Sequence, residues 1–155
     1  MARSYTVHSQ RPAPGRFEAM PENECLKRLQ SNDIGRIGLV DPDVRPLIFP
    51  VNYFFDAGVV AFRTGPGTKL DLAPGSHVCL EIDGWDPLAD LGWSVLVKGF
   101  AHDFTNPRGS PAGMVRFWPV RPLAPGSREH WIAIAVDEIT GRWFRKALRS
   151  DGIAP

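Results

Sequence analysis

The stretch from Phe62 to Leu70 has the residue types that hold a phosphate group. It reads Phe-Arg-Thr-Gly-Pro-Gly-Thr-Lys-Leu, so a strand pattern ends in a glycine-rich turn, and Thr68 and Lys69 open a short helical run. Free backbone N–H groups, a hydroxyl and an ammonium group would face one point there, which suits a phosphate. Arg63 would add a planar two-pronged donor. The glycine spacing is too short for the nucleoside-triphosphate motif G-x-x-x-x-G-K-[ST].

The same residues also have a purely structural interpretation. Thr68 would then cap the short helix and Lys69 would be an ordinary solvated lysine, because both are common roles. Arg36 would either pair with Glu81 or reach a bound phosphate. Trp93 would either contact a ligand or simply pack in a core or an interface. The segments taken singly leave these alternatives open.

Other kinds of chemistry have little support in the sequence. The four histidines are scattered without metal-ligand spacing, so we expect no metal site. No Ser/His/Asp or Cys/His arrangement follows from the spacing, and we expect no side chain to act as a catalytic acid or base. Cys25 and Cys79 are expected to be reduced thiols.

The elements that would position these residues are mostly strands. Glu22–Gln30 is predicted to be a helix with Pro21 in its first turn, acids early and basic residues late. Asp56-Ala57-Gly58 predicts a hairpin turn, Pro50 an edge or bulge, and Gly99 a bend or bulge. Strand patterns cover residues 34–40, 47–55, 59–64, 77–83, 92–104 and 132–136.

Six strands joined mostly by short turns are expected to close into a small antiparallel barrel, because closure removes exposed edges. Helices do not alternate regularly with strands, which argues against a doubly wound parallel sheet. Residues 105–129 would form a long connection, with about one helical turn near 114–118. We expect residues 1–16 to be a flexible N-terminal arm and residues 17–150 to be the barrel domain.

Composition narrows the expected partners and location. There are 18 basic and 17 acidic residues, a net charge of +1, which gives no electrostatic reason to expect nucleic acid. No apolar run approaches the ~20 residues of a membrane helix, and residues 1–16 lack the apolar region of a signal peptide. We therefore expect a cytoplasmic protein that binds neither nucleic acid nor membrane.

Five phrases in order resemble the split-barrel flavoproteins related to pyridoxamine 5′-phosphate oxidase, and more closely a bacterial group of that superfamily with unassigned roles. The resemblance runs from about residue 18 to about residue 143. Each phrase alone is weakly specific, and five in the right order are more so. The phrases are Ile34–Ile37, Phe49–Tyr53, Phe62–Leu70, Val78–Asp83 and Gly92–Gly99.

This resemblance implies a mainly β protein, a six-stranded antiparallel split β-barrel with a few short peripheral helices. It also implies a homodimer with FMN in a groove at the subunit interface. Carried over position by position, it assigns Arg63, Thr64, Thr68 and Lys69 to the phosphate and ribityl chain. It further implies that the isoalloxazine is lined by Pro50, Val51 and Asn52, with Trp93 and Ser94 contributing from the fifth strand, across the dimer interface or within one chain.

The sequence departs from the oxidase itself at its end. The Arg-x-His pair that receives the substrate there has no counterpart, and Gly141–Arg145 stands in its place. We therefore expect an FMN-dependent reductase or oxidase that exchanges electrons with a small molecule, and not a pyridoxamine-phosphate oxidase. Two alternatives stay open. One is a deazaflavin-dependent reductase, with Arg36, Arg142 and Arg145 near the longer tail; the other is a non-enzymatic flavin- or ligand-binding module for stress response.

Overall fold

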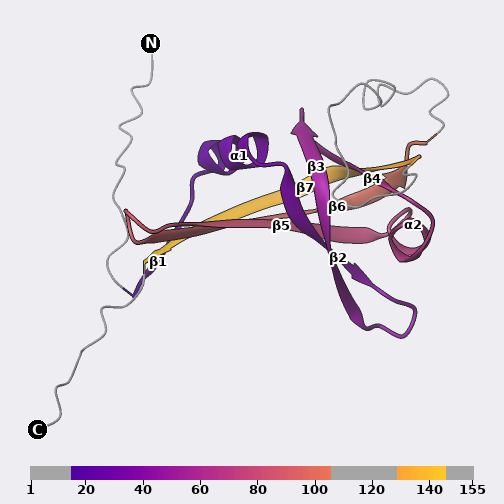
Figure 1. The fold of residues 1–155 in the computed structure, drawn as a ribbon, viewed down its shortest axis with the longest axis horizontal. Coiled ribbons are helices and arrows are strands. Elements are labelled where there is room, and N and C mark those ends of the chain that lie inside the picture. The colour runs from indigo at the N-terminus through magenta and orange to yellow at the C-terminus, as the bar shows by residue number, and fades with distance from the viewer. Residues whose placement is uncertain (1–14, 106–128, 146–155) are drawn as a thin grey trace, which may run out of the picture.

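The chain is described by a computed structural model that covers residues 15–105 and 129–145. It is built almost entirely from strands, with two helices in the described part (Figure 1). The elements are β1 (Phe17–Ala19), α1 (Glu22–Ser31), β2 (Ile34–Val40), β3 (Pro46–Asp56), β4 (Val59–Thr64), α2 (Thr68–Leu72), β5 (His77–Asp86), β6 (Leu91–Asp103) and β7 (His130–Arg145).

Six of the strands close into an antiparallel ring. The order is β7-β4-β3-β2-β5-β6, and a further pairing of β6 with β7 joins the two ends. The short strand β1 adds to the far end of β7, where Glu18 pairs with Trp143. The described residues therefore confirm the predicted barrel, and β1 is an addition that its three-residue pattern gave no reason to expect.

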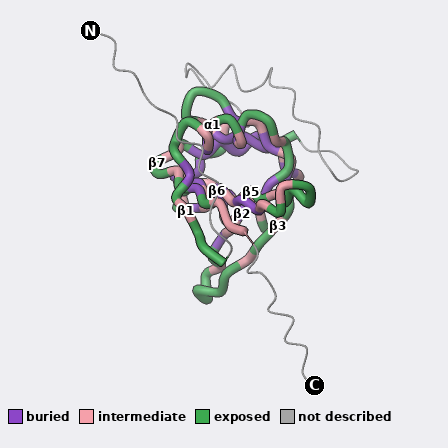
Figure 2. The backbone as a smooth tube through the Cα atoms, turned by 90° about the vertical axis from the view of Figure 1, so that its left-hand side faces the viewer, coloured by how far each residue is buried: buried purple, intermediate pink, exposed green. Residues whose placement is uncertain are grey.

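Alternation along the strands places the core inside this ring (Figure 2). On β5, Val78, Leu80 and Ile82 are buried, whereas the residues between them are partly or fully exposed. Successive side chains of a strand point to opposite faces, so each strand gives one row to the interior. A second, smaller cluster of buried residues combines Ala61, Trp131 and Ala133 on β4 and β7.

Helix α1 covers part of this interior. Its residues Cys25 and Leu29 are almost fully buried and belong to the same core as the inward-facing strand residues. The buried Tyr53 hydroxyl donates a hydrogen bond to the Leu29 carbonyl at 2.9 Å, which ties the end of the helix to β3. The predicted helix is confirmed and extends one residue further, to Ser31, with Pro21 as its N-cap.

The predicted turns and irregularities occur where the residue types placed them. Ala57 and Gly58 both have positive φ, 47° and 78°, between the paired residues Asp56 and Val59. A two-residue hairpin loop of this kind has the twist that matches its strands. The register of β6 against β7 shifts between Lys98 and Gly99, so the predicted bulge is confirmed.

Pro50 lies where β3 has a single strand neighbour. Residues 46–52 of β3 pair with β2, and only residues 53–56 pair with β4. A residue without an N–H group is tolerated where one side of the strand is unpaired. The edge prediction is therefore confirmed, and the register through Pro50 has no bulge.

Several predictions fall partly or wholly outside the described residues. The arm at residues 1–16, the helical turn near 114–118 and the end of the barrel domain at residue 150 all include such positions. The domain bounds 1–16 and 17–150 stay predictions. Within the part that the structure describes, no helix is long and apolar enough to cross a membrane.

Candidate functional site

The candidate site begins where strands β3 and β4 separate. Their pairing runs from the hairpin to the pair Tyr53 and Phe62 and stops there. The next residues, Asn52 on β3 and Arg63 on β4, therefore flank the point at which the strands diverge. Both belong to the residues that the sequence assigned to a flavin.

Both of these side chains carry a buried polar atom that has no hydrogen-bond partner within residues 15–105 and 129–145. Asn52 donates from Nδ2 to the Asp33 carbonyl at 3.2 Å, but its Oδ1 is buried and unpartnered. The guanidinium carbon of Arg63 lies 5.5 Å from the centroid of the Trp131 ring, and its Nε is buried and unpartnered. Leaving a buried polar group unsatisfied costs about 1–3 kcal/mol, so an acceptor and a donor here need a partner.

The turn after β4 brings further polar groups to this region. Gly67 has φ 124°, a conformation that favours glycine, and its carbonyl accepts the first helical bonds from the amides of Leu70 and Asp71. The amides of Thr68 and Lys69 precede those first helical bonds. Gly67 is the N-cap of α2, and no side-chain cap is formed, so the structural interpretation of Thr68 as a capping residue is wrong.

Lys69 connects the turn to β3. Its Nζ lies 4.9 Å from the centroid of the Phe49 ring, one residue before Pro50. Val51 and Thr64 point inward and are almost fully buried, and the Thr64 hydroxyl donates to the Gly65 carbonyl at 3.1 Å. The structure thus brings seven of the nine predicted residues to one region, formed by β3, the end of β4 and the start of α2: Pro50, Val51, Asn52, Arg63, Thr64, Thr68 and Lys69.

Trp93 and Ser94 lie elsewhere in the chain. Gly75 and Ser76, just after α2, exchange backbone hydrogen bonds with Ala101 of β6. Ser94 is seven residues away along that strand, which corresponds to roughly 23 Å of extended chain. The Trp93 side chain faces inward, and Arg28 of α1 lies 4.4 Å from the centroid of its ring. Within one chain, neither residue joins the other seven.

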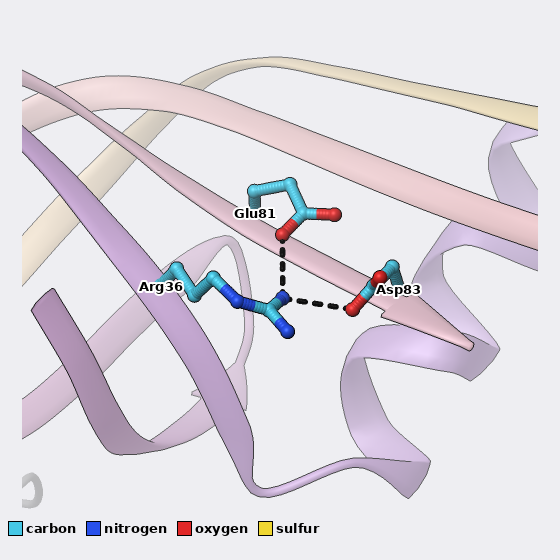
Figure 3. Close-up of polar contacts among 3 residues, drawn as sticks. All are labelled: Arg36, Glu81 and Asp83. Carbon is cyan, nitrogen blue, oxygen red and sulfur yellow. Dashed lines mark hydrogen bonds and ion pairs between the residues drawn. The ribbon is translucent and has the colours of Figure 1, made fainter. Parts of the chain in front are cut away.

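Arg36 is held by two carboxylates (Figure 3). Its Nη1 donates to Glu81 Oε2 at 2.9 Å and to Asp83 Oδ1 at 2.8 Å, and both acids lie on β5. Burial raises the pKa of Glu81, the Asp83 carboxylate raises it further, and Arg36 opposes both effects. Of the two roles open to Arg36, the structure has the pairing with Glu81.

A groove of about 700 Å³ lies beside Arg36. We call it the outer groove. None of the nine predicted residues lines it, although Arg36 pairs in register with Pro50 on one side and with Glu81 on the other. Its lining includes Arg36, Gly38, Ile48, Cys79, Leu96 and Lys98.

Trp131 and Phe49 are the contacts that sequence reasoning missed. Trp131 pairs with Arg63 across β4 and β7, and Phe49 lies under Lys69. The apolar pattern of 47–55 marked Phe49 only as a strand residue. Trp131 is about 70 positions from Arg63, so its role depends on a strand pairing that local patterns do not give. In the described part of the chain, no cluster of three or more His, Cys, Asp or Glu side chains is arranged to hold a metal ion.

Comparisons with known proteins show what the whole chain is similar to. A family model described as pyridoxamine 5′-phosphate oxidase matches residues 21–143. The chain is similar to an uncharacterized protein of Mycobacterium tuberculosis, 32% identical over 111 residues, which cover 61% of this chain and 72% of the relative.

Two solved structures are also similar to the chain. One is a Corynebacterium glutamicum protein described as a candidate pyridoxamine 5′-phosphate oxidase, 30% identical with a TM-score of 0.69, covering 84% of this chain and 99% of that one. The other is the FAD binding protein of Mycobacterium smegmatis, 32% identical with a TM-score of 0.68, covering 82% and 97%.

Proposed function

The chain belongs to the pyridoxamine 5′-phosphate oxidase family, and from this premise we propose that it is a flavoprotein that binds FMN between β3, the end of β4 and the start of α2. In this proposal the protein works as an oxidoreductase on a small molecule. The observation that carries it is the pair of buried, unpartnered atoms, Asn52 Oδ1 and Arg63 Nε, at the point where β3 and β4 separate.

The residues of this region fit the two ends of FMN. The Thr68 hydroxyl, the Lys69 ammonium and the amides that precede the first helical bonds of α2 would hold the phosphate, because charge-assisted bonds contribute about 1.5–3 kcal/mol each. Arg63 and Thr64 would hold the phosphate or the ribityl chain. Pro50 and Asn52 would line the ring with their side chains, where Asn52 Oδ1 can accept a hydrogen bond, and the inward-pointing Val51 would contribute backbone groups.

When bound, a flavin supplies the redox chemistry itself, and the protein supplies position, electrostatics and exclusion of side reactions. The chain's own residues then have binding and orienting tasks. Arg63 offers an Nε–H donor, and the Trp131 ring beside it restricts where that donor points. We propose no side chain as a proton donor or acceptor in the reaction.

A homodimer is part of the proposal. Ser94 pairs with Asp83 on β5, and two strands, β2 and β5, lie between Ser94 and the proposed flavin residues on β3, so we propose that a second copy of the chain brings its Ser94 to the flavin. Alternation places Ser94 on the face opposite the inward-pointing Trp93. Trp93 in this proposal supports the strand from inside and does not touch the flavin.

FAD is a second candidate for the flavin. The similar protein from Mycobacterium smegmatis, 32% identical to this chain, is an FAD binding protein. A dinucleotide shares the isoalloxazine and ribityl parts of FMN, so the same residues would serve it. A deazaflavin has the same ribityl chain on a ring of the same shape in which carbon replaces N5, and all three cofactors belong in the same titration series.

The experiment compares FMN with riboflavin, which has the same ring and ribityl chain but no phosphate. We expect the wild-type protein to prefer FMN. The substitution Lys69→Ala should weaken FMN binding by about tenfold or more, equivalent to about 1.4 kcal/mol, and should change riboflavin affinity little. Quenching of flavin fluorescence on titration measures both affinities.

Lys98→Ala is the matched control, because Lys98 is also a lysine but pairs with Glu138 on the outer face of β6 and β7. It should leave both affinities unchanged. Equal loss of FMN and riboflavin binding in Lys69→Ala would contradict the phosphate role, and so would unchanged FMN affinity.

A further inference from the structure

We propose that the outer groove is the binding site for the reacting substrate, and that this substrate is an uncharged, largely apolar molecule. This assignment rests on the proposed function, since it places a second ligand beside the flavin. The groove has about 700 Å³, within the range of 300–1,000 Å³ that small-molecule sites occupy.

The groove is next to the proposed flavin residues. Pro50 pairs with Arg36 across β3 and β2, and Ile48 pairs with Gly38. Pro50 and Ile48 are two residues apart, so they share one face of β3 at a separation of about 7 Å. A flavin ring on Pro50 would therefore have the lining of the groove as its neighbour along the same face.

The floor of the groove is apolar and is formed by small side chains. Gly38 pairs with Cys79, and a Cβ at Gly38 would come within 2.6 Å of the Cys79 sulfur. Leu96 lies on the neighbouring strand β6 and Ile48 on the wall formed by β3. The Ile48 residue is 69% exposed, so this wall presents apolar surface that a ligand can cover.

The charges of the lining do not favour an anion. Its two cations are already held by carboxylates, Arg36 by Glu81 and Asp83, and Lys98 by Glu138 at 3.0 Å. Asp137 adds a further exposed carboxylate at the rim. A phosphorylated substrate would have to displace an ion pair to find a counter-charge, whereas an uncharged molecule leaves both pairs intact.

The test uses Nile red, an uncharged apolar dye whose emission rises and shifts to shorter wavelength in apolar sites. We expect saturable binding that uncharged menadione displaces and pyridoxal 5′-phosphate does not. Cys79→Trp should fill the groove and weaken Nile red binding by about tenfold or more. Leu88→Trp is the control, because Leu88 is 98% exposed at the turn after β5, away from the groove.

A second measurement needs no variant. Cys79 is partly exposed in the groove, whereas Cys25 is buried, so N-ethylmaleimide should label Cys79 in the folded protein. Saturating Nile red should slow that labelling. This readout keeps the proposal testable even if Cys79→Trp does not fold.

Four results would overturn the proposal: no saturable Nile red binding, no protection of Cys79, displacement by pyridoxal 5′-phosphate as effective as by menadione, or conversion of a dimer to a monomer by Cys79→Trp. The last result would make the groove a contact between copies of the chain. Both measurements are made without flavin and with FMN added. Groove occupancy without FMN binding would refute the proposed function, and FMN binding without groove occupancy would refute only this inference.

Discussion

At the scale of single residues, the site is distinguished by polar atoms that the fold leaves unsatisfied. Asn52 Oδ1 and Arg63 Nε are buried beside a polar turn and have no hydrogen-bond partner among the residues that the structure describes. By contrast, the Arg36 guanidinium forms ion pairs with both Glu81 and Asp83. From the sequence, Arg36 and Arg63 were similar candidates for binding a phosphate. Only the pairing of β2 with β5 shows that Arg36 is engaged in ion pairs, whereas Arg63 still has a donor, Nε, without a partner among the described residues.

The Arg36 cluster predicts a specific pH dependence of stability. The pKa of Glu81 is raised in the folded state, from an ordinary value of 4.5, because its carboxyl is partly buried and faces Asp83. As the pH rises through the window just above 4.5, the folded state holds a proton that the unfolded state has lost. The free energy of unfolding should therefore fall across this window.

Glu81→Gln should remove this decrease in the free energy of unfolding. The difference in free energy of unfolding between the variant and the wild type should therefore shift in favour of the variant as the pH rises through the window. The change should be less than about 1 kcal/mol, because the pair is partly exposed. Urea unfolding at several pH values measures it. Arg36→Met, which removes the opposing cation, should extend the fall to higher pH. Parallel curves for wild type and Glu81→Gln would contradict the prediction.

At the scale of elements, α1 is fixed to the barrel by one buried hydrogen bond as well as by packing. Tyr53→Phe keeps the ring and removes the donor to the Leu29 carbonyl. We expect it to lower the free energy of unfolding by about 1–2 kcal/mol, because the carbonyl is left without its partner. Denaturant midpoints measure the loss, and faster amide exchange at the end of α1 should accompany it. An unchanged midpoint would show that the bond contributes nothing.

The register of β6 against β7 shifts at Gly99, where the two backbones approach closely. A Cβ at this position would collide with the Ala135 carbonyl oxygen and come within 2.7 Å of Ile134 Cγ2. Gly99→Ala should therefore destabilise the protein by about 1–3 kcal/mol or more, since backbone cannot easily move aside.

Lys98→Ala, one residue earlier, is the comparison, because it removes an exposed ion pair with Glu138 and should cost less than about 1 kcal/mol. Thermal unfolding of both variants measures the difference. Equal losses in the two variants would contradict the steric argument, because they would show that position 99 tolerates a side chain.

The elements differed in how well their residues predicted them. Strand patterns located all six barrel strands, by alternation in residues 77–83 and 132–136 and by a long apolar run in residues 47–55, and the turn at Ala57 and Gly58 followed from turn chemistry alone. The ends of the strands were predicted less accurately. Strand β7 continues to Arg145, well beyond the predicted residues 132–136, because its later residues pair with β6 and β1 although they do not alternate cleanly. The short strand β1 exists only through its pairing with β7, which local patterns do not encode.

At the scale of the whole molecule, ring closure explains which predicted site residues meet. Pro50 to Asn52 and Arg63 to Lys69 converge because β3 and β4 are neighbours that separate at one end. Trp93 and Ser94 were assigned by resemblance alone, and within one chain strands β2 and β5 lie between them and β3. Such long-range placement depends on strand order and, in our proposal, on a second copy of the chain, and spacing in the sequence determines neither.

The outer groove has the same origin. Its floor comes from Gly38 and Cys79, its wall from Ile48 and its rim from Lys98, on four different strands. In the sequence, each of these residues is an ordinary strand position. Only the closed barrel brings them together in one surface beside Pro50. A site of this kind therefore cannot be found from a sequence motif.

The measurement that tests the account most directly is the absorbance spectrum of the purified protein, followed by titration with FMN. We predict that the purified protein has the absorbance bands of a bound flavin. If the protein is colourless as isolated, added FMN should show saturable fluorescence quenching at one flavin per chain. The affinity should then be micromolar or tighter, which corresponds to a binding free energy of about 8 kcal/mol. A protein that is colourless as isolated and leaves FMN fluorescence unchanged at all concentrations would contradict the flavoprotein assignment.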